Sequence, residues 1–181
     1  MSDQSIQLRV ATAADLPALL KLMDSVLDWL VARRRTQQWG DVPFSQIPGF
    51  PDRVADWVAQ GVITLAERGT DCLGLLAIAP VVPPRIPAGL VPARAMFVHT
   101  VMTERGPRGQ GIGFLLMQEA ERQARAASAP ALALDHWAGS DELHRIYRKH
   151  GYTTVGEYDD GRQADAPKIR NVVQVLHLQD T

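Results

Sequence analysis

The sequence predicts a mixed α/β fold in which helices pack on a single β-sheet. Short alternating or β-branched apolar runs are interspersed with segments whose apolar residues recur every three or four positions. Their order, β-α-α-β-β-β-α-β-α-β-β, combines hairpin neighbours with crossover helices. The chain has 181 residues, of which 46% are hydrophobic and 22% charged, so we expect one folded domain over residues 1–181.

The N-terminal part is predicted to form a strand followed by two helices. Apolar and polar residues alternate over residues 6–10, as in a short strand. Thr12 lies three residues before Asp15, which resembles a capping box, and helically spaced apolar residues then continue to about Arg33. The second helix is predicted over residues 52–60, where the glycine that follows is placed to end it.

The rest of the chain is predicted to form six strands and two helices. The first two of these strands flank a Gly-Thr-Asp turn and indicate a hairpin, and a proline-rich connector follows them. One predicted helix follows the glycine-rich stretch that comes after residue 103 and runs to about residue 127, and the other covers residues 141–150. The predicted strands cover residues 62–67, 72–82, 96–103, 131–137, 153–158 and 169–178.

Composition narrows the possible functions. A net charge of −1 and an aromatic content of 6% argue against a nucleic-acid binder. The single cysteine, Cys72, gives no metal-ligand cluster; it lies in an aliphatic run and is predicted to be a core residue rather than a nucleophile. The N-terminus does not resemble a signal peptide, and no apolar run approaches the ~20 residues of a membrane span. We therefore expect a cytoplasmic protein with no membrane partner and no bound metal.

The stretch "RGPRGQGIG", residues 105–113, is the most informative part of the sequence. Gly109, Gly111 and Gly113 alternate where a strand gives way to a helix. Glycine allows a tight bend and lets a ligand approach the backbone, and the first amides of a helix lack internal partners. Such a turn suits a phosphate, with Arg108 adding positive charge. A simple glycine-rich helix cap is the alternative interpretation.

Two common phosphate loops do not fit this stretch. A P-loop ends in Gly-Lys-Ser/Thr, whereas Phe114 follows Gly113 here. A dinucleotide fingerprint that started at Gly109 would require glycine at position 114, and it would usually belong to a first βαβ unit.

The pattern Arg-x-x-Gly-x-Gly over residues 108–113, together with "LALDHWAGSDELHRIYRKHGY" over residues 132–152, resembles the GNAT superfamily of acyl-CoA-dependent N-acyltransferases. The resemblance extends over nearly the whole chain. It implies a central, mostly antiparallel mixed sheet of about seven strands with a splayed parallel pair, flanked by about four helices. It also implies acetyl-CoA as co-substrate.

The same resemblance implies which residues bind coenzyme A. In the family, backbone amides of the glycine turn bind the pyrophosphate, and free main-chain groups of the preceding strand pair with the pantetheine arm. Family members often have asparagine at position 140, where serine is expected to have a shorter reach. The implied cofactor-binding residues are Val101, Met102, Thr103, Arg108, Gly109, Gln110, Gly111, Ile112, Gly113, Phe114 and Ser140.

Two residues are candidates for proton transfer. The resemblance implies that Tyr147 protonates the departing thiolate, although a structural tyrosine packed on the sheet is the alternative. His99, two residues before Val101, is a candidate base because the pKa of an imidazole is near neutral, but it could equally be a histidine with only structural contacts. Glu104, Asp135 and His136 are weaker candidates, since no motif points to them.

The acceptor side is less well defined. Trp39, between the first two helices, and Trp137, at the end of a strand, are candidate substrate-binding residues, because an aromatic ring can hold an amine by cation–π contact. Trp29 and Trp57 lie at helical positions and are predicted to be core, and a core position is the alternative for Trp39. The arginines at 33–35 are expected to be a solvated helix end, and a grip on an anionic acceptor or on the CoA 3′-phosphate is the alternative. The loop over residues 159–168 is expected to border or cover the acceptor site.

The sequence therefore predicts an N-acetyltransferase. We expect transfer of an acetyl group from acetyl-CoA to a primary amine of a small molecule, by direct attack in a ternary complex. The alternatives are acylation of a protein or peptide N-terminus, and a non-catalytic module that senses acyl-CoA. We expect a monomer or a homodimer.

Overall fold

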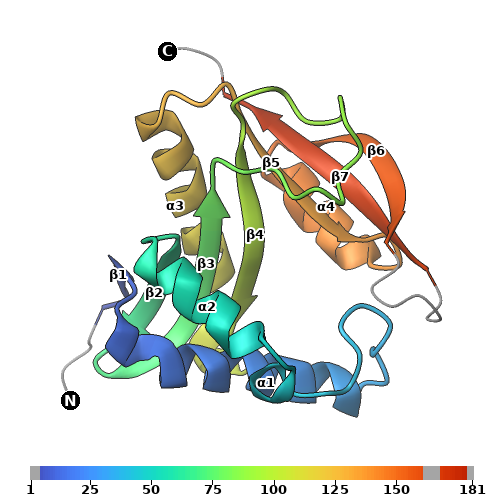
Figure 1. Ribbon diagram of the computed structural model, residues 1–181. Helices are drawn as coiled ribbons and strands as arrows, with labels where there is room; N and C mark the ends of the chain where they lie inside the picture. Colours follow the sequence, from blue (N-terminus) through green and yellow to red (C-terminus); the bar gives the residue numbers. More distant parts are fainter. Residues whose placement is uncertain (1–4, 161–167, 179–181) are drawn as a thin grey trace. The chain divides into compact units, whose positions relative to one another are not determined.

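The computed structural model describes residues 5–160 and 168–178 and has the predicted order of elements (Figure 1). The strands are β1 Gln7–Val10, β2 Ile63–Arg68, β3 Asp71–Ala79, β4 Met96–Thr103, β5 Ala131–Trp137, β6 Thr153–Asp160 and β7 Ile169–His177. The helices are α1 Leu16–Ala32, α2 Phe50–Ala59, α3 Ile112–Ala126 and α4 Asp141–Lys149, with short 3-10 turns η1 Ala13–Asp15, η2 Phe44–Gln46 and η3 Pro107–Gly109.

The sheet has seven strands in the order β1-β2-β3-β4-β5-β7-β6. β4 and β5 are parallel, while β1 with β2, β2 with β3, β5 with β7 and β6 with β7 are antiparallel. The predicted fold class, a mostly antiparallel mixed sheet flanked by four helices, is thus confirmed.

By its internal contacts the chain divides into two compact units. The first comprises Met1–Ile78 and Thr100–Glu119, and the second comprises Ala79–His99 and Ala120–Thr181. Strand β4 and helix α3 contribute residues to both units. The single domain expected over residues 1–181 stays a prediction.

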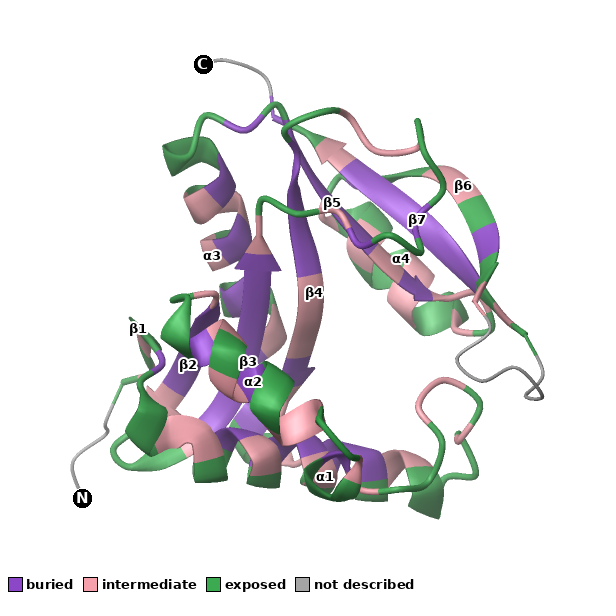
Figure 2. Cartoon of the chain, viewed as in Figure 1, coloured by how far each residue is buried: buried purple, intermediate pink, exposed green. Residues whose placement is uncertain are grey.

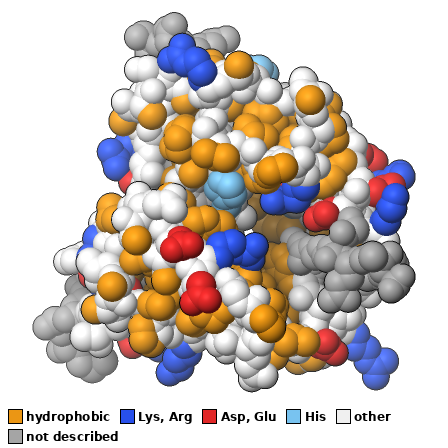
Figure 3. All heavy atoms as spheres, viewed as in Figure 1, with side chains coloured by type: hydrophobic (Ala, Val, Ile, Leu, Met, Phe, Trp, Pro, Cys, Tyr) orange, Lys and Arg blue, Asp and Glu red, His pale blue; other side chains and the backbone are white. Residues whose placement is uncertain are grey.

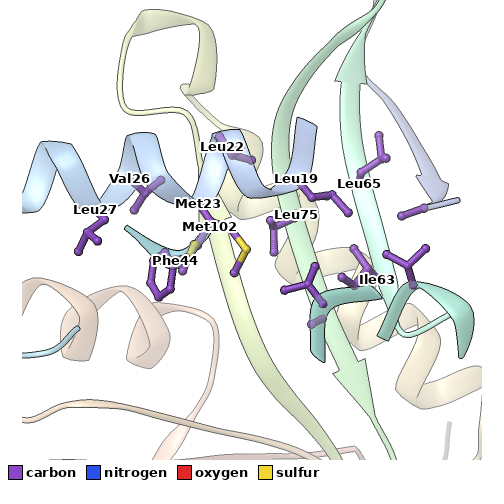
Figure 4. Close-up of a cluster of buried hydrophobic side chains, with 14 residues drawn as sticks. Leu19, Leu22, Met23, Val26, Leu27, Phe44, Ile63, Leu65, Leu75 and Met102 are labelled. Carbon is purple, nitrogen blue, oxygen red and sulfur yellow. The ribbon is translucent and has the colours of Figure 1, made fainter. Parts of the chain in front are cut away.

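In the first unit, helices cover both faces of the sheet. Buried side chains of α1 and α2 pack on one face, against Leu75 of β3 and Met102 of β4 (Figure 4). On the other face α3 lies so close that a Cβ on Gly74 would come within 2.7 Å of Ile112 Cγ2. Because β3 is covered on both sides, its sequence is a nearly continuous run of apolar residues. Figure 2 shows the strand buried along most of its length.

The second unit has its own buried cluster. Phe97 of β4 packs with residues of β5, β6 and β7, and the proline-rich connector contributes Ile86 to the same cluster. Met96–Val98 of β4 pair in parallel with Leu132–Leu134 of β5, and the pairing of these two strands ends at Val98 and Leu134. The pairing thus ends before the residues of β4 that were expected to bind pantetheine.

Most elements begin or end one or two residues away from the predicted boundary, and the largest difference is at the end of β3. That strand was predicted to reach residue 82 but ends at Ala79, because Pro80 has no N–H to donate to a neighbouring strand. The predicted capping box at the first helix is present, since the Thr12 amide donates to the Asp15 carboxylate at 2.8 Å.

The described residues contain neither a membrane-spanning helix nor a cluster of metal-ligating side chains. No helix in residues 5–160 or 168–178 is long and apolar enough to span a bilayer. Within the same residues, no group of three or more His, Cys, Asp or Glu side chains is arranged to hold a metal ion.

Candidate functional site

The glycine turn lies in the first unit, between β4 and α3. Gly109 is buried, and a Cβ there would overlap the carbonyl oxygen of Glu104, so this position accepts only glycine. The Gly109 amide donates to the Glu104 carboxylate at 2.9 Å. Glu104, a weaker base candidate from the sequence, therefore has a structural role, since it ties the turn to the end of β4.

The next two glycines of the turn border open space. Gly111 has a φ of +80°, a left-handed conformation that favours glycine, and nothing lies within 4 Å of the position a Cβ would take. At Gly113, in the first turn of α3, such a Cβ would meet only Thr103 Cγ2, at 3.9 Å. The backbone is therefore left uncovered at both positions.

Three amides at the end of this turn, those of Gly111, Ile112 and Gly113, are available to a ligand, whereas the Gly109 and Gln110 amides donate within the turn. Among the described residues, the N–H groups of Gly111, Ile112 and Gly113 make no backbone hydrogen bond outside the helix, and the first N–H groups of a helix have no acceptor within it. They lie at the positive end of the α3 dipole. An anion bound here would receive hydrogen bonds and a favourable field, which is the chemistry expected of a pyrophosphate site.

Arg108, which was expected to contact phosphate, forms an ion pair in the structure. Its Nη2 lies 2.5 Å from the Asp71 carboxylate, and both side chains are exposed. Exposed pairs of this kind contribute little to stability, so the guanidinium can exchange partners at low cost.

The last three residues of β4 comprise one buried and two half-buried side chains. Met102 is buried against α1, whereas Val101 and Thr103 are half-buried. Glu104 continues the pairing with β3, since its amide donates to the Leu73 carbonyl at 2.8 Å.

Tyr147 lies in the second unit, on α4, among aromatic side chains. Its ring lies 5.6 Å from that of His136 and 5.9 Å from that of Tyr152. Tyr147 is half-buried, whereas Tyr152 is buried and its hydroxyl has no hydrogen-bond partner among the described residues. Burial raises the pKa of Tyr152 far above that of a free phenol.

Ser140 begins helix α4. Its Oγ accepts a hydrogen bond from the Leu143 amide at 3.3 Å, so the residue is the N-cap of the helix. The sequence signal for this role was present, because serine followed by two acidic residues is typical of a helix start. The predicted contact of Ser140 with the cofactor stays a prediction.

His99 lies in the second unit beside a network of charged and polar side chains. Burial lowers the pKa of His99, and the nearby Arg85 guanidinium acts in the same direction, whereas the Val81 backbone and Asp135 act to raise it. The lowered pKa keeps the imidazole neutral at pH 7, the form that can accept a proton.

The other two weaker base candidates have structural partners. The Asp135 carboxylate receives two hydrogen bonds from Arg85, at 3.0 and 3.2 Å, and a short one from the Tyr158 hydroxyl. The Nδ1 of His136 lies 3.0 Å from the Trp137 carbonyl, which can only accept, so Nδ1 carries the proton. Arg85, Asp135 and Tyr158 form a hydrogen-bonded network, and no local sequence pattern predicts it because the three residues lie far apart in the sequence.

Trp57 is packed as predicted, and the predicted contacts of Trp39 and Trp137 with the acceptor stay predictions. Trp57 is partly buried against the core of the first unit, as is the candidate acceptor residue Trp39, whose ring lies 5.7 Å from that of Phe44. The prediction that Trp29 belongs to the core is wrong, because its half-buried ring is covered by arginine side chains. Trp137 is half-buried, with its ring over Gly139. Most of the predicted acceptor loop, residues 161–167, lies outside the described residues.

Comparison with known proteins identifies the family. The model of the acetyltransferase (GNAT) family matches residues 23–152, well over half of the sequence. The chain belongs to the GNAT acetyltransferase family. The match includes the glycine turn, Tyr147 and Tyr152, and it confirms the resemblance seen in the sequence.

Individual relatives are distant. YesJ of Bacillus subtilis (strain 168), an uncharacterized N-acetyltransferase, is 34% identical over 62 residues, which is 34% of each chain. The match therefore spans about a third of that relative's length.

Solved structures share the fold over nearly the whole chain. The ribosomal-protein-alanine N-acetyltransferase of Brucella melitensis has a TM-score of 0.70 at 21% identity, covering 95% of this chain and 99% of its own. YncA of Salmonella typhimurium, solved with its cofactor acetyl-CoA, has a TM-score of 0.68 at 15% identity, covering 97% of this chain and 95% of its own.

Cys72 provides a direct test of covalent catalysis. Burial raises the pKa of its thiol to about 11, and the sulfur lies 3.8 Å from the Gly74 carbonyl. Since the thiolate is the nucleophile, the thiol is unreactive at neutral pH. We expect Cys72→Ala to keep kcat within about twofold, since Cys72 takes no part in the chemistry. A steady-state assay of a folded variant checks this, and a loss of most activity would favour an acyl-enzyme.

Proposed function

We propose that the chain transfers an acetyl group from acetyl-CoA to a primary amine of a small molecule, by direct attack in a ternary complex. The observation that carries the proposal is the row of uncovered amides at Gly111, Ile112 and Gly113, which begins a helix in a chain of this family. YncA, a structural neighbour, was solved with acetyl-CoA, which supports acetyl-CoA as the donor.

The cofactor contacts that we propose follow the sequence motif. The backbone of residues 109–114 would bind the pyrophosphate, with Arg108 released from Asp71 to add charge. Main-chain groups of Val101, Met102 and Thr103 would pair with the pantetheine amides, as an added strand pairs with a free edge.

The proposed chemistry removes two protons from the acceptor nitrogen and delivers one to the leaving sulfur. The acceptor amine must be neutral before its nitrogen attacks the thioester carbon, and neutral His99 would accept the ammonium proton, directly or through water. As the carbon–sulfur bond breaks, the sulfur takes up the electron pair, and the Tyr147 phenol would donate a proton to it. The nitrogen, now bonded to the carbonyl carbon, would lose its second proton to the Tyr147 phenolate, directly or through water, as the amide forms. Trp39 and Trp137 remain our candidates for contact with the acceptor.

The acceptor class is open to experiment. An assay of thiol release from acetyl-CoA with small amines (polyamines, amino acids, aminoglycosides) and with short peptides tests the proposal directly. Faster turnover of a peptide N-terminus would instead favour the activity named for the Brucella neighbour. Tight binding of acetyl-CoA without turnover of any amine would favour an acyl-CoA sensor.

With His99 as the proposed base, its pKa sets the acid side of the pH profile of kcat/KM. Because burial lowers its pKa, the imidazole becomes protonated only below the ordinary value of about 6.5. We expect kcat/KM to fall with decreasing pH only below that value, where protonation of His99 removes the base. His99→Gln should abolish this dependence and lower kcat/KM at pH 7.5 by about tenfold, because solvent can accept the proton less efficiently. An acid limb that persists unchanged in His99→Gln would assign the base elsewhere.

On the face shown in Figure 3, basic and acidic side chains are interspersed, in keeping with the net charge of −1. No broad basic surface suited to nucleic acid is visible on that face.

A further inference from the structure

His99 and Asp135 occupy equivalent positions on two neighbouring strands of the second unit. Each directly follows the last parallel pair of β4 and β5, which joins Val98 to Leu134. Side chains at equivalent positions of parallel strands point to the same face of a sheet. On that face the His99 ring lies 5.4 Å from the ring of buried Phe97.

The proline-rich connector between β3 and β4 packs in the same unit through a tight turn. Ile86 is buried in the core of this unit, and its amide donates to the Pro83 carbonyl at 3.0 Å. The rings of Pro83 and Pro84 fix two backbone φ angles in the turn. Few backbone rotations therefore remain between Val81, early in the connector, and Arg85.

Arg85 attaches this turn to the sheet. Its Nη2 and Nε donate to the two oxygens of the Asp135 carboxylate at 3.0 and 3.2 Å, and Nε also donates to the Tyr158 hydroxyl at 3.1 Å. The Tyr158 hydroxyl in turn donates to Asp135. The Asp135 side chain is only 12% exposed and Tyr158 is buried. A forked, charge-assisted pair on buried acceptors holds the guanidinium in one orientation.

The start of the connector contacts His99. The imidazole makes a hydrogen bond with the Val81 backbone, and this bond acts to raise the pKa of His99. A bond that raises the pKa of a base favours its protonated form, so a ring N–H donates to the Val81 carbonyl. In the neutral ring that nitrogen keeps its proton, and the lone pair is on the other nitrogen. The Val81 carbonyl thus selects the tautomer of His99.

We propose that Arg85 is a positioning residue for His99: by holding the proline turn on Asp135 and Tyr158, it fixes the Val81 carbonyl and so determines which nitrogen of His99 accepts the proton of the acceptor amine. This inference rests on the proposed acetyl transfer, in which His99 is the base. Arg85 itself transfers no proton, because a guanidinium stays protonated. Asp135, a weaker base candidate from the sequence, keeps Arg85 in place.

The first test observes the His99 ring without reference to activity. In protein with nitrogen-15 in its histidines, the ring N–H signal of His99 is assigned by its loss in His99→Gln. Its exchange rate with solvent is measured at pH 8, where the imidazole is neutral. A ring N–H bonded to a fixed carbonyl exchanges slowly, so Arg85→Gln should raise the rate at least about tenfold.

Further variants grade the effect. Arg85→Lys keeps the charge but has no forked donor, and Tyr158→Phe removes one partner of Arg85, so each should give an intermediate exchange rate. Arg85→Lys also provides the measurement if Arg85→Gln does not fold. Arg170→Gln is the matched control, since Arg170 of β7 pairs with Asp159 at 3.2 Å in the same unit, where both side chains are exposed. It should leave the His99 signal unchanged.

The second test asks whether Arg85 acts through His99. We expect Arg85→Gln to lower kcat/KM at pH 7.5 by about fivefold in the parent enzyme. In a His99→Gln background the same substitution should have no further effect, because residues that act as a unit are not additive. Arg170→Gln should leave kcat/KM unchanged in both backgrounds.

The two tests fail separately. A His99 ring N–H that exchanges equally fast in the parent and in Arg85→Gln overturns the positioning role, as does a loss of kcat/KM that is equally large with and without His99. Full kcat/KM in His99→Gln would instead overturn the proposed base. The exchange rates would then still decide whether Arg85 fixes the His99 ring.

Discussion

Replacing Tyr147 with phenylalanine should lower kcat by about 100-fold, the lower end of what a positioned general acid contributes. The substitution keeps the ring, and with it the contacts to the His136 and Tyr152 rings, but removes the phenolic proton. The affinity for CoA should change little, because pyrophosphate binding is assigned to the backbone of the glycine turn. Steady-state kinetics together with calorimetry on the folded variant check both parts.

The leaving group provides a second readout for the same variant. A thiolate of a more acidic thiol needs less protonation as it departs, so the loss in Tyr147→Phe should be smaller with an acyl donor of that kind. A structural tyrosine would show no dependence on the leaving thiol. Normal kcat with acetyl-CoA in a folded Tyr147→Phe enzyme would make Tyr147 part of the scaffold.

Tyr152→Phe is the matched control. Tyr152 is buried, its ring contacts that of Tyr147, and its hydroxyl has no hydrogen-bond partner among the described residues. Removing a buried hydroxyl without a partner costs no hydrogen bond within the protein, so the variant should be as stable as the parent. Its kcat should stay within about twofold of the parent value, in contrast to Tyr147→Phe.

The fold could be predicted from the sequence because its signals are local. Hydrophobic spacing located every strand and helix, and glycines such as Gly61 and Gly151, both with positive φ, ended helices where expected. The strand predicted to reach residue 82 crossed Pro80, and the missing N–H of that proline was a local signal too.

The surroundings of the candidate residues were not predictable, because they depend on contacts between distant segments. Asp135 looked like a possible base until its partners Arg85 and Tyr158 were known, and neither lies near it in the sequence. Trp29 looked like a core residue because its helical spacing carries no information about Arg105. The glycine motif was readable because the function proposed for it depends on main-chain amides, whose arrangement the local sequence determines.

The second large effect is expected for Gly113→Ala, a substitution in the glycine turn that should change the affinity for CoA. Without ligand, the added methyl group meets only Thr103 Cγ2 at 3.9 Å, and alanine favours a helix over glycine by about 0.5–1 kcal/mol. The variant should therefore be slightly more stable than the parent. Its affinity for CoA should nevertheless fall by about 100-fold. The methyl would hold the pyrophosphate away from the amides, and losing two charge-assisted hydrogen bonds at ~1.5 kcal/mol each gives that factor.

The opposite signs of these two effects make Gly113→Ala a stringent test of the pyrophosphate site. Thermal unfolding and calorimetric titration with CoA would be measured on the same preparation. Gly109→Ala serves as the contrast, since its Cβ would overlap the Glu104 carbonyl and should destabilise the protein even without ligand. A glycine turn that only caps α3 would tolerate alanine at position 113 with unchanged CoA affinity. That result would remove the pyrophosphate from this turn, whereas a more stable protein that binds CoA poorly would mean that the space at Gly113 is kept for the ligand.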